Sequence, residues 1–193
     1  LFKMTPAGVV TIVHTFGDGS VANDGVWPLA SIIPGSDGNY YGPQAFGGTA
    51  GGSTAFKFSL PATHFTVSAA PTATAGSAFN VTITALNAFN GTVKNYTAAV
   101  HFTSTDGSAT LSSDTTLTGG TGIFSATLKT AGSQTITVTD TVSTSLTRTT
   151  GSIAVGVGGA IHFALTTPSS VTVGAAFTIT ISAVDTYGNK DTG

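Results

Sequence analysis

The chain has 193 residues and a formal net charge of −2, and charged residues make up 7% of it, about a quarter of the usual share. Its six Lys and Arg residues are scattered, which excludes the clustered basic surface of a nucleic-acid-binding protein. The absence of Cys excludes disulfides and thiol chemistry. No apolar run approaches the ~20 residues that a membrane-spanning helix needs. Thr, Val, Ile and Phe are plentiful and Glu is absent, so we expect an all-β fold.

Residues 1–61 form the first predicted module. Its opening segment, Leu1–Thr5, recurs at the end of the module as Ala55–Ser59. Four or five short strands within one such period predict a single propeller-like blade, which must stack on neighbours because it cannot cover both of its own faces. We place the boundary near Pro61. Between the two recurring segments, strands are expected at Val9–Thr15, Leu29–Ile33 and Asn39–Tyr41.

Residues 62–158 have the pattern of a complete Ig-like β-sandwich. Apolar and polar residues alternate most clearly in Ala78–Leu86, as one-sided burial of a strand requires. Turn signals such as Asn90-Gly91 and Asp106-Gly107 separate the strands. Seven strands are expected, at His64–Ala69, Ala78–Leu86, Ala98–Ser104, Ser108–Ser112, Gly122–Lys129, Ser133–Asp140 and Thr147–Val157.

The core of this sandwich is expected to come from one face of each strand. Truncating a fully buried Phe costs about 3–5 kcal/mol, and we expect Phe79→Ala to have a cost of that size. The expected inward-facing residues include Phe79, Val100, Phe102, Phe124 and Ile136.

Residues 159–193 repeat the beginning of the sandwich without a gap. His64-Phe65 aligns with His162-Phe163, and Gly76 aligns with Gly174. The repeat length is close to the ~100 residues of one Ig-like domain, so these residues are predicted to be the first strands of a second, truncated Ig-like repeat. We therefore expect the chain to be part of a longer precursor. The inner face of the second copy, with no covering sheet in this chain, consists of Phe163, Phe177, Ile179 and Ile181.

Two resemblances follow from these motifs. In residues 1–61, the stretches FKMTPAG, SDGNYYG and AFKFS resemble the bacterial GloVer repeat, which implies a tandem, propeller-like array in an exported, often surface-anchored protein. From His64 onward, TAGSAFNVTITALNAF, VHFTSTD and GIFSATLKTAGSQTITVTD resemble the Ig-like repeats of large bacterial surface proteins and adhesins. Family copies usually have the sequence A-F-G-N after the second strand, and the second copy has the similar Thr186-Tyr187-Gly188-Asn189 there. Asn90-Gly91 reverses that order, which leaves the conformation of this loop open.

The sequence predicts no catalytic and no cofactor-binding residue. There is no G-x-S-x-G elbow. His64 and His162 are repeat-equivalent, which favours a packing role, and His14 and His101 have no second ligand at metal-binding spacing. No Asp-Gly turn has the alternating acidic run of a dedicated Ca²⁺ loop. The weak Ca²⁺ candidates, which turn chemistry alone also explains, are Asp185, Asn189 and Asp191.

Two classes of function remain open. The preferred one is a non-enzymatic structural or adhesive module of a secreted or cell-surface bacterial repeat protein. Such a module would build an extracellular stalk or filament by head-to-tail β contacts with copies of itself or with adjacent repeats. The alternative is an accessory or carbohydrate-binding region of a larger secreted enzyme. Trp27, Tyr40 and Tyr41 could then form a platform for a surface glycan, although stacking among themselves within the blade is favoured.

Overall fold

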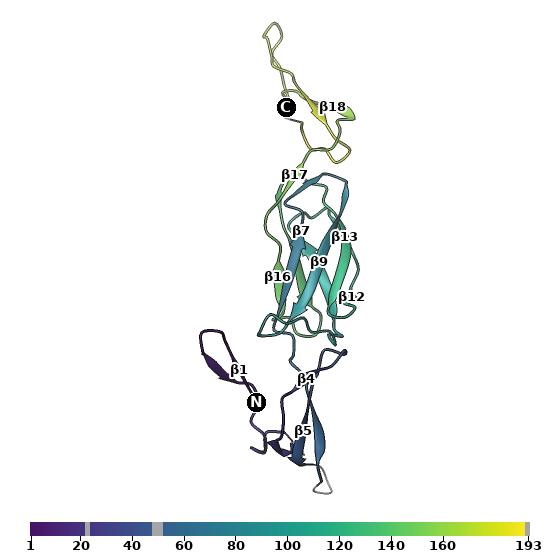
Figure 1. The fold of residues 1–193 in the computed structure, drawn as a ribbon. Coiled ribbons are helices and arrows are strands. Elements are labelled where there is room, and N and C mark those ends of the chain that lie inside the picture. The colour runs from purple at the N-terminus through teal and green to yellow at the C-terminus, as the bar shows by residue number, and fades with distance from the viewer. Residues whose placement is uncertain (22–23, 48–51, 192–193) are drawn as a thin grey trace. The chain divides into compact units, whose positions relative to one another are not determined.

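The computed structural model describes residues 1–21, 24–47 and 52–191. These residues contain nineteen β-strands and no helix. In the part of the chain that is described, no helix is long and apolar enough to cross a membrane. The chain divides into two compact units, Leu1–Pro61 and Ala62–Gly193 (Figure 1). The expectation of an all-β protein is confirmed.

Unit Leu1–Pro61 contains two small sheets. One is an antiparallel pair of β1 (Phe2–Met4) and β2 (Val10–Ile12). In the other, β5 pairs with β6 along one edge and with β3 and then β4 along the opposite edge. The bounds of these four strands are β3 (Val26–Pro28), β4 (Ile33–Pro34), β5 (Tyr40–Phe46) and β6 (Thr54–Phe58).

The expected strand Leu29–Ile33 is largely wrong, because β3 ends at Pro28 and β4 begins only at Ile33. Pro28 and Pro34 have no amide hydrogen to donate to a ladder, so each pairing with β5 stays short. Val9–Thr15 contains only the three-residue β2. The unit is all-β, but this arrangement does not identify a propeller blade.

The first main sheet of unit Ala62–Gly193 has the strand order β11-β13-β9-β7. It corresponds to the D-E-B-A order of an Ig-like domain. In Figure 1, β7, β9 and β13 lie side by side in this sheet. Two of the expected strands, β7 and β9, match to the residue. The bounds are β7 (His64–Ala69), β9 (Ala78–Leu86), β11 (Thr110–Leu111) and β13 (Thr121–Thr127).

The second main sheet has the order β12-β10-β15-β16, which contains the C-F-G arrangement of the Ig-like fold. All its neighbouring strands are antiparallel. The short edge strand β12 was not expected from the sequence. The bounds are β10 (Ala99–Ser104), β12 (Thr115–Thr116), β15 (Ile136–Asp140) and β16 (Thr147–Thr149).

A third sheet of three strands explains why two expected long strands are divided. Thr137 lies opposite Thr149, and Gln134 lies opposite Ile153. Between these two pairs, the later segment of the chain therefore has one residue more than the earlier segment, which is a β-bulge. The bulge lies around Thr150, whose Oγ1 accepts the Ile136 amide at 3.1 Å. The sheet runs β14 (Gly132–Gln134), β17 (Ile153–Gly156) and β8 (Thr72–Thr74), with β17 and β8 parallel.

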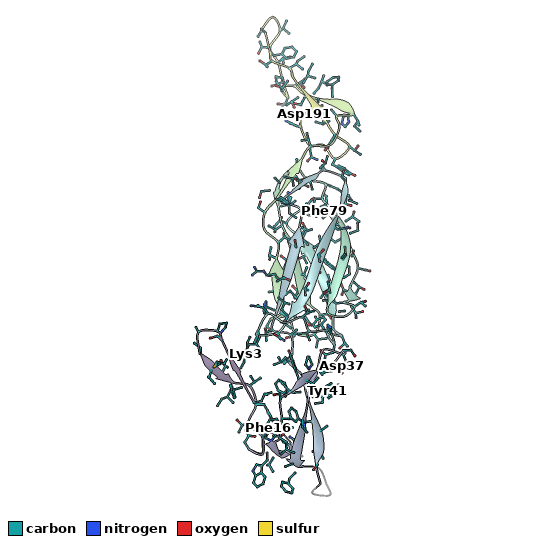
Figure 2. The ribbon with its side chains drawn as sticks, in the orientation of Figure 1. Lys3, Phe16, Asp37, Tyr41, Phe79 and Asp191 are labelled. Atoms are coloured by element: carbon teal, nitrogen blue, oxygen red, sulfur yellow. The ribbon has the colours of Figure 1, made fainter. Side chains whose placement is uncertain are left out.

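The core lies between the two main sheets. Val100, Phe102 and Ile136 are buried, as expected. Phe79 on β9 (Figure 2) and Phe124 are half-buried and pack against this core. The expected set of inward-facing residues is thus confirmed. Because the Phe79 ring keeps some exposure, however, Phe79→Ala should cost less than a fully buried Phe does.

The second copy reproduces the strand register of the first over fewer residues. β18 (His162–Thr166) pairs antiparallel with β19 (Thr180–Val184), with Phe163 opposite Ala183. In the first copy, β7 pairs with β9 and Phe65 lies opposite Ala85.

The loop left open by the sequence has the same conformation in both copies. Asn90 has φ +60°, and the equivalent Gly188 has φ +83°. The backbone amide of Asn87 donates to the Gly91 carbonyl at 2.9 Å, and that of Asp185 donates to the Asn189 carbonyl at 3.0 Å. Asn is among the few residues other than Gly that tolerate the left-handed region, so the reversed order of Asn90 and Gly91 leaves the turn unchanged.

Candidate functional site

A buried polar cluster lies in the turn Asp185–Asn189, directly after β19. The Asp185 side chain, in a residue only 2% exposed, accepts four hydrogen bonds. Its Oδ1 accepts the amides of Tyr187 and Asn189, both at 2.9 Å. Its Oδ2 accepts the Gly158 amide at 2.9 Å and Asn189 Nδ2 at 2.8 Å. The first pair closes the turn, and the Gly158 bond reaches the segment that precedes the second copy.

Asn189 connects the same turn to the preceding sandwich. Its Oδ1 accepts the Ala131 amide at 2.9 Å, and its Nδ2 donates to the Lys129 carbonyl at 2.7 Å. Both partners belong to the loop between β13 and β14. One planar amide group therefore satisfies a backbone donor and a backbone acceptor at the end of the sandwich.

The aromatic ring of the turn forms a third contact. Tyr187 packs over Gly76, where an added Cβ would lie 2.5 Å from a ring carbon. Gly76 also has φ +82°, a left-handed conformation that favours glycine. The position therefore requires Gly for two separate reasons, its backbone and the ring above it.

The electrostatics of Asp185 follow from these donors. Burial raises the pKa of the carboxyl group, but the hydrogen bonds from Asn189, Gly158 and Tyr187 outweigh it and lower the pKa to about 2. Asp185 is therefore a stable carboxylate at neutral pH.

The structure brings two of the three Ca²⁺ candidates together in an arrangement that suits hydrogen bonding. Both Asp185 oxygens face N–H donors, and Asn189 turns its Nδ2 toward Asp185 and its Oδ1 toward Ala131. A Ca²⁺ site needs six to eight oxygens converging on one point. Asp191 is exposed. Among the described residues, no group of three or more His, Cys, Asp or Glu side chains could hold a metal ion.

Two His residues, His14 and His101, have carboxylate partners in the structure. His14 Nε2 lies 2.9 Å from Asp24 Oδ2, and His101 Nδ1 lies 2.7 Å from Asp114 Oδ1. His64 contacts Asn90 Oδ1 at 3.1 Å. No sequence motif signals either His–Asp pair, because the partners come from turns 10 and 13 residues away.

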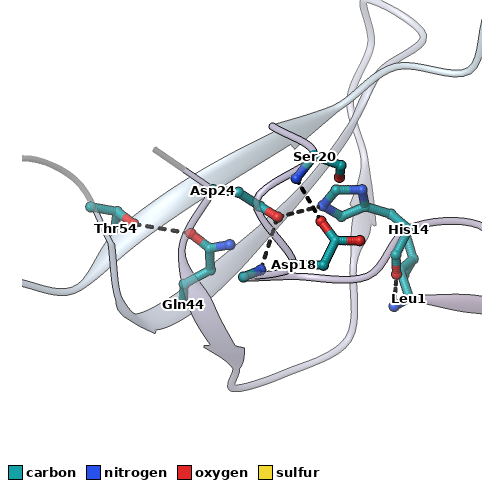
Figure 3. A network of polar contacts seen from close by, with 8 residues as sticks. Leu1, His14, Asp18, Ser20, Asp24, Gln44 and Thr54 are labelled. Atoms are coloured by element: carbon teal, nitrogen blue, oxygen red, sulfur yellow. Dashed lines mark hydrogen bonds and ion pairs between the residues drawn. The ribbon is translucent and has the colours of Figure 1, made fainter. Parts of the chain in front are cut away.

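The His14–Asp24 pair organises a turn-rich part of unit Leu1–Pro61 (Figure 3). Asp24 Oδ2 also accepts the Gly17 amide at 3.1 Å, and the His14 ring packs edge-on against Phe16 with centroids 4.7 Å apart. The site is thus a His–carboxylate pair beside an aromatic ring, and its contacts connect Asp24 to His14 and to the Gly17 backbone.

The three aromatic residues considered as a glycan platform do not form one surface. Tyr40 and Tyr41 are consecutive on β5, so their side chains point to opposite faces. The Tyr41 hydroxyl donates to Asp37 Oδ2 at 2.6 Å (Figure 2).

Trp27 is 69% exposed, and its ring contacts that of Phe46 edge-on with centroids 5.5 Å apart. It lines an open groove of about 450 Å³ together with His14 and Phe16. The expected stacking of Trp27 on the two Tyr residues is absent from the described contacts.

The inner face of the second copy is exposed in this chain. All four residues expected there have solvent-exposed side chains: Phe163, Phe177, Ile179 and Ile181. Among the described residues, β19 pairs with no strand other than β18. In the first copy, β13 pairs with the other edge of β9. The equivalent edge of β19 has no neighbouring strand in the described part of the chain, although its last residues contact the chain that follows: Val184 forms a bridge with Lys190, and the Ala183 carbonyl accepts the Asp191 amide at 3.0 Å.

Structural comparison connects the chain to bacterial Ig-like proteins. No family model matches the chain, and no curated protein matches it in sequence. The structure of FdeC, an Escherichia coli adhesin, matches 85% of this chain with a TM-score of 0.51 and 19% identity. This chain spans 60% of the FdeC structure. At this level of identity the match shows the fold, an Ig-like architecture shared with a bacterial surface adhesin.

Two further structures match less well. Invasin, a bacterial integrin-binding protein, has a TM-score of 0.45 and 19% identity, over 82% of this chain and 34% of invasin. A family 2 glycosyl hydrolase from Bacteroides cellulosilyticus has a TM-score of 0.44 and 13% identity, over 64% of this chain and 18% of the hydrolase.

Proposed function

We propose that the chain is a structural or adhesive segment of a secreted or cell-surface bacterial protein, built from tandem β modules and without catalytic activity of its own. Residues 1–61 are one GloVer-like, blade-like unit of an array, residues 62–158 a complete Ig-like module, and residues 159–193 the first strands of another. The fold shared with FdeC supports the Ig-like part of this proposal.

The observation that carries the proposal is the open second copy. Its strands pair in the same register as in the first copy, yet its apolar face is exposed. One edge of β19 has no neighbouring strand among the described residues, apart from the bridge between Val184 and Lys190 at its end. Exposed edges of this kind accept further strands through main-chain hydrogen bonds. A strand from an adjacent repeat or from another copy of the chain completes the module head to tail. Such a heterologous contact does not close on itself, so repeated contacts form a fibre.

Sedimentation velocity and electron microscopy of the whole chain test the proposal. We expect concentration-dependent association that Ile181→Asp abolishes. Ile123→Asp is the matched control, because Ile123 is equally exposed but lies on the outer face of the complete sandwich. A chain that stays monomeric at all concentrations, or an equal loss of association in both variants, contradicts the head-to-tail contact.

Surface location is tested separately on the bacteria that produce the protein. Antibodies against the chain should label intact cells or the culture medium. Labelling only after lysis contradicts the proposed location.

The exposed Trp27 favours a second candidate, a carbohydrate-binding accessory region of a secreted enzyme. An exposed indole beside an open groove is suited to stacking on a sugar ring. A glycan array probed with the chain and with Trp27→Ala separates the two functions. Binding that this substitution removes supports the accessory region, and no binding supports the structural role. Assays with esterase, glycosidase and peptidase substrates should give background rates.

A further inference from the structure

The turn Asp185–Asn189 contacts three separate parts of the preceding sandwich. Asp185 accepts the Gly158 amide, Asn189 pairs with the backbone of Lys129 and Ala131, and Tyr187 covers Gly76. These parts are the segment after β17, the β13–β14 loop and the turn before β9. Contacts to three points that are distant in sequence are more than the turn needs for its own conformation.

The equivalent turn of the first copy shows which contacts are extra. Asn87 Oδ1 accepts the amides of Phe89 and Gly91 at 2.9 and 3.0 Å, as Asp185 Oδ1 does for Tyr187 and Asn189. The turn therefore closes equally well with Asn or Asp at its first position.

The two turns differ at the positions that reach outward. Where Asp185 has Oδ2, which accepts, Asn87 has an Nδ2 group, which donates. Where Asn189 has a side-chain amide, Gly91 has no side chain. The Asn87–Gly91 pattern at this position would set a donor against the Gly158 amide, and it would remove the side chain that now pairs with the Lys129 carbonyl and the Ala131 amide.

We propose that the Lys129 carbonyl and the Ala131 and Gly158 amides form a docking surface for the turn of the next Ig-like repeat in tandem, and that Asp185 and Asn189 determine the specificity of this joint. The partner is another Ig-like module with Asp at the first position of the turn and Asn at the fifth. The proposal concerns the joint itself and is independent of the extracellular role proposed above.

Amide hydrogen exchange measured by NMR on the whole chain tests the joint. In the parent chain, the Ala131 and Gly158 amides should be protected. Asp185→Asn should lower protection at Gly158 by about ten-fold or more, as expected for losing a hydrogen bond to a charged group. Asn189→Gly should lower protection at Ala131 by less, about two- to ten-fold, because the Asn189 Oδ1 acceptor is uncharged. Both variants install residues that the first copy already carries in the same turn.

The turn itself provides the internal control. The Asp185 amide donates to the Asn189 carbonyl at 3.0 Å and should stay protected in both variants. Asn87→Asp, at the equivalent position of the first copy, should change neither Ala131 nor Gly158. The proposal is overturned if these two amides are unprotected in the parent chain, if the variants leave them protected, or if protection of the Asp185 amide is lost together with theirs.

Discussion

The first two strands of the two repeats pair in the same register but have opposite surroundings, and the second strand is shorter in the second copy, five residues in β19 against nine in β9. Phe65 is 1% exposed and its equivalent Phe163 is 70% exposed; Ile83 is 0% exposed and Ile181 is 62% exposed. Strand register and turn conformation nevertheless agree between the copies.

This difference separates two causes of structure. Pairing of the strands and closure of the turn depend on alternation and on turn residues, which both copies share. Burial depends on a second sheet, which the first copy obtains from β10 and β15 and which the described part of the second copy does not contain. The following predictions test that separation.

The largest expected effect is a contrast between equivalent Phe residues. Phe65→Ala should lower the free energy of unfolding of the sandwich by about 3–5 kcal/mol, because a fully buried ring is lost. Phe163→Ala should change it by less than about 0.5 kcal/mol, as exposed positions usually do. Urea unfolding of both variants measures the two values. Similar costs would show that Phe163 is covered in solution.

A second substitution removes one polar contact that completes the first copy. The Tyr96 hydroxyl donates to the buried carboxylate of Asp140 at 2.5 Å. Burial and this hydrogen bond raise the pKa of Tyr96. Tyr96→Phe keeps the ring against Phe65 but removes a donor to a charged group, so it should cost about 1.5–3 kcal/mol. Urea unfolding measures the cost, and a value near zero would show that water replaces the hydroxyl.

The shared turn predicts a difference between two substitutions at Gly188. Gly188→Val should destabilise the second copy by about 1–2 kcal/mol, because a β-branched residue is strained at positive φ. Gly188→Asn should have little effect, since Asn90 adopts the same conformation in the first copy. Exchange of the Asp185 amide reports both. Equal protection in the two variants would contradict the common backbone conformation.

The smallest expected effect is a pH dependence of the Asp185–Asn189 turn that the equivalent turn of the first copy does not share. The pKa of Asp185 is lowered from 3.8 to about 2, so its stabilising contribution is complete above about pH 4 and is lost as the pH falls toward 2. Asn87 does not ionise. The amide shifts of Tyr187 and Asn189 should therefore titrate near pH 2, and those of Phe89 and Gly91 should follow no such titration. A midpoint near 3.8 would show that the hydrogen bonds to Asp185 are not formed in solution.

Several elements could be predicted from residue order because their causes are local. The alternation in Ala78–Leu86 predicted both the strand and its buried face. The division of the expected strands Ser133–Asp140 and Thr147–Val157 could not be predicted, because the bulge at Thr150 depends on how the two segments pair with each other. Prolines 28 and 34 were visible in the sequence, and their effect on Leu29–Ile33 could have been anticipated from the missing amide hydrogens.

The candidate site divides in the same way. Sequence alone determined the all-β class, the repeat and the turn at Asp185–Asn189, since propensity, alternation and turn chemistry act between residues close in the chain. Only the tertiary structure decided that Asp185 and Asn189 meet Gly158, Lys129 and Ala131, that His14 meets Asp24, and that one copy is covered while the other is exposed. The partners in these contacts are mostly backbone groups or residues of distant turns. Every residue carries such backbone groups, so they leave no trace in a sequence.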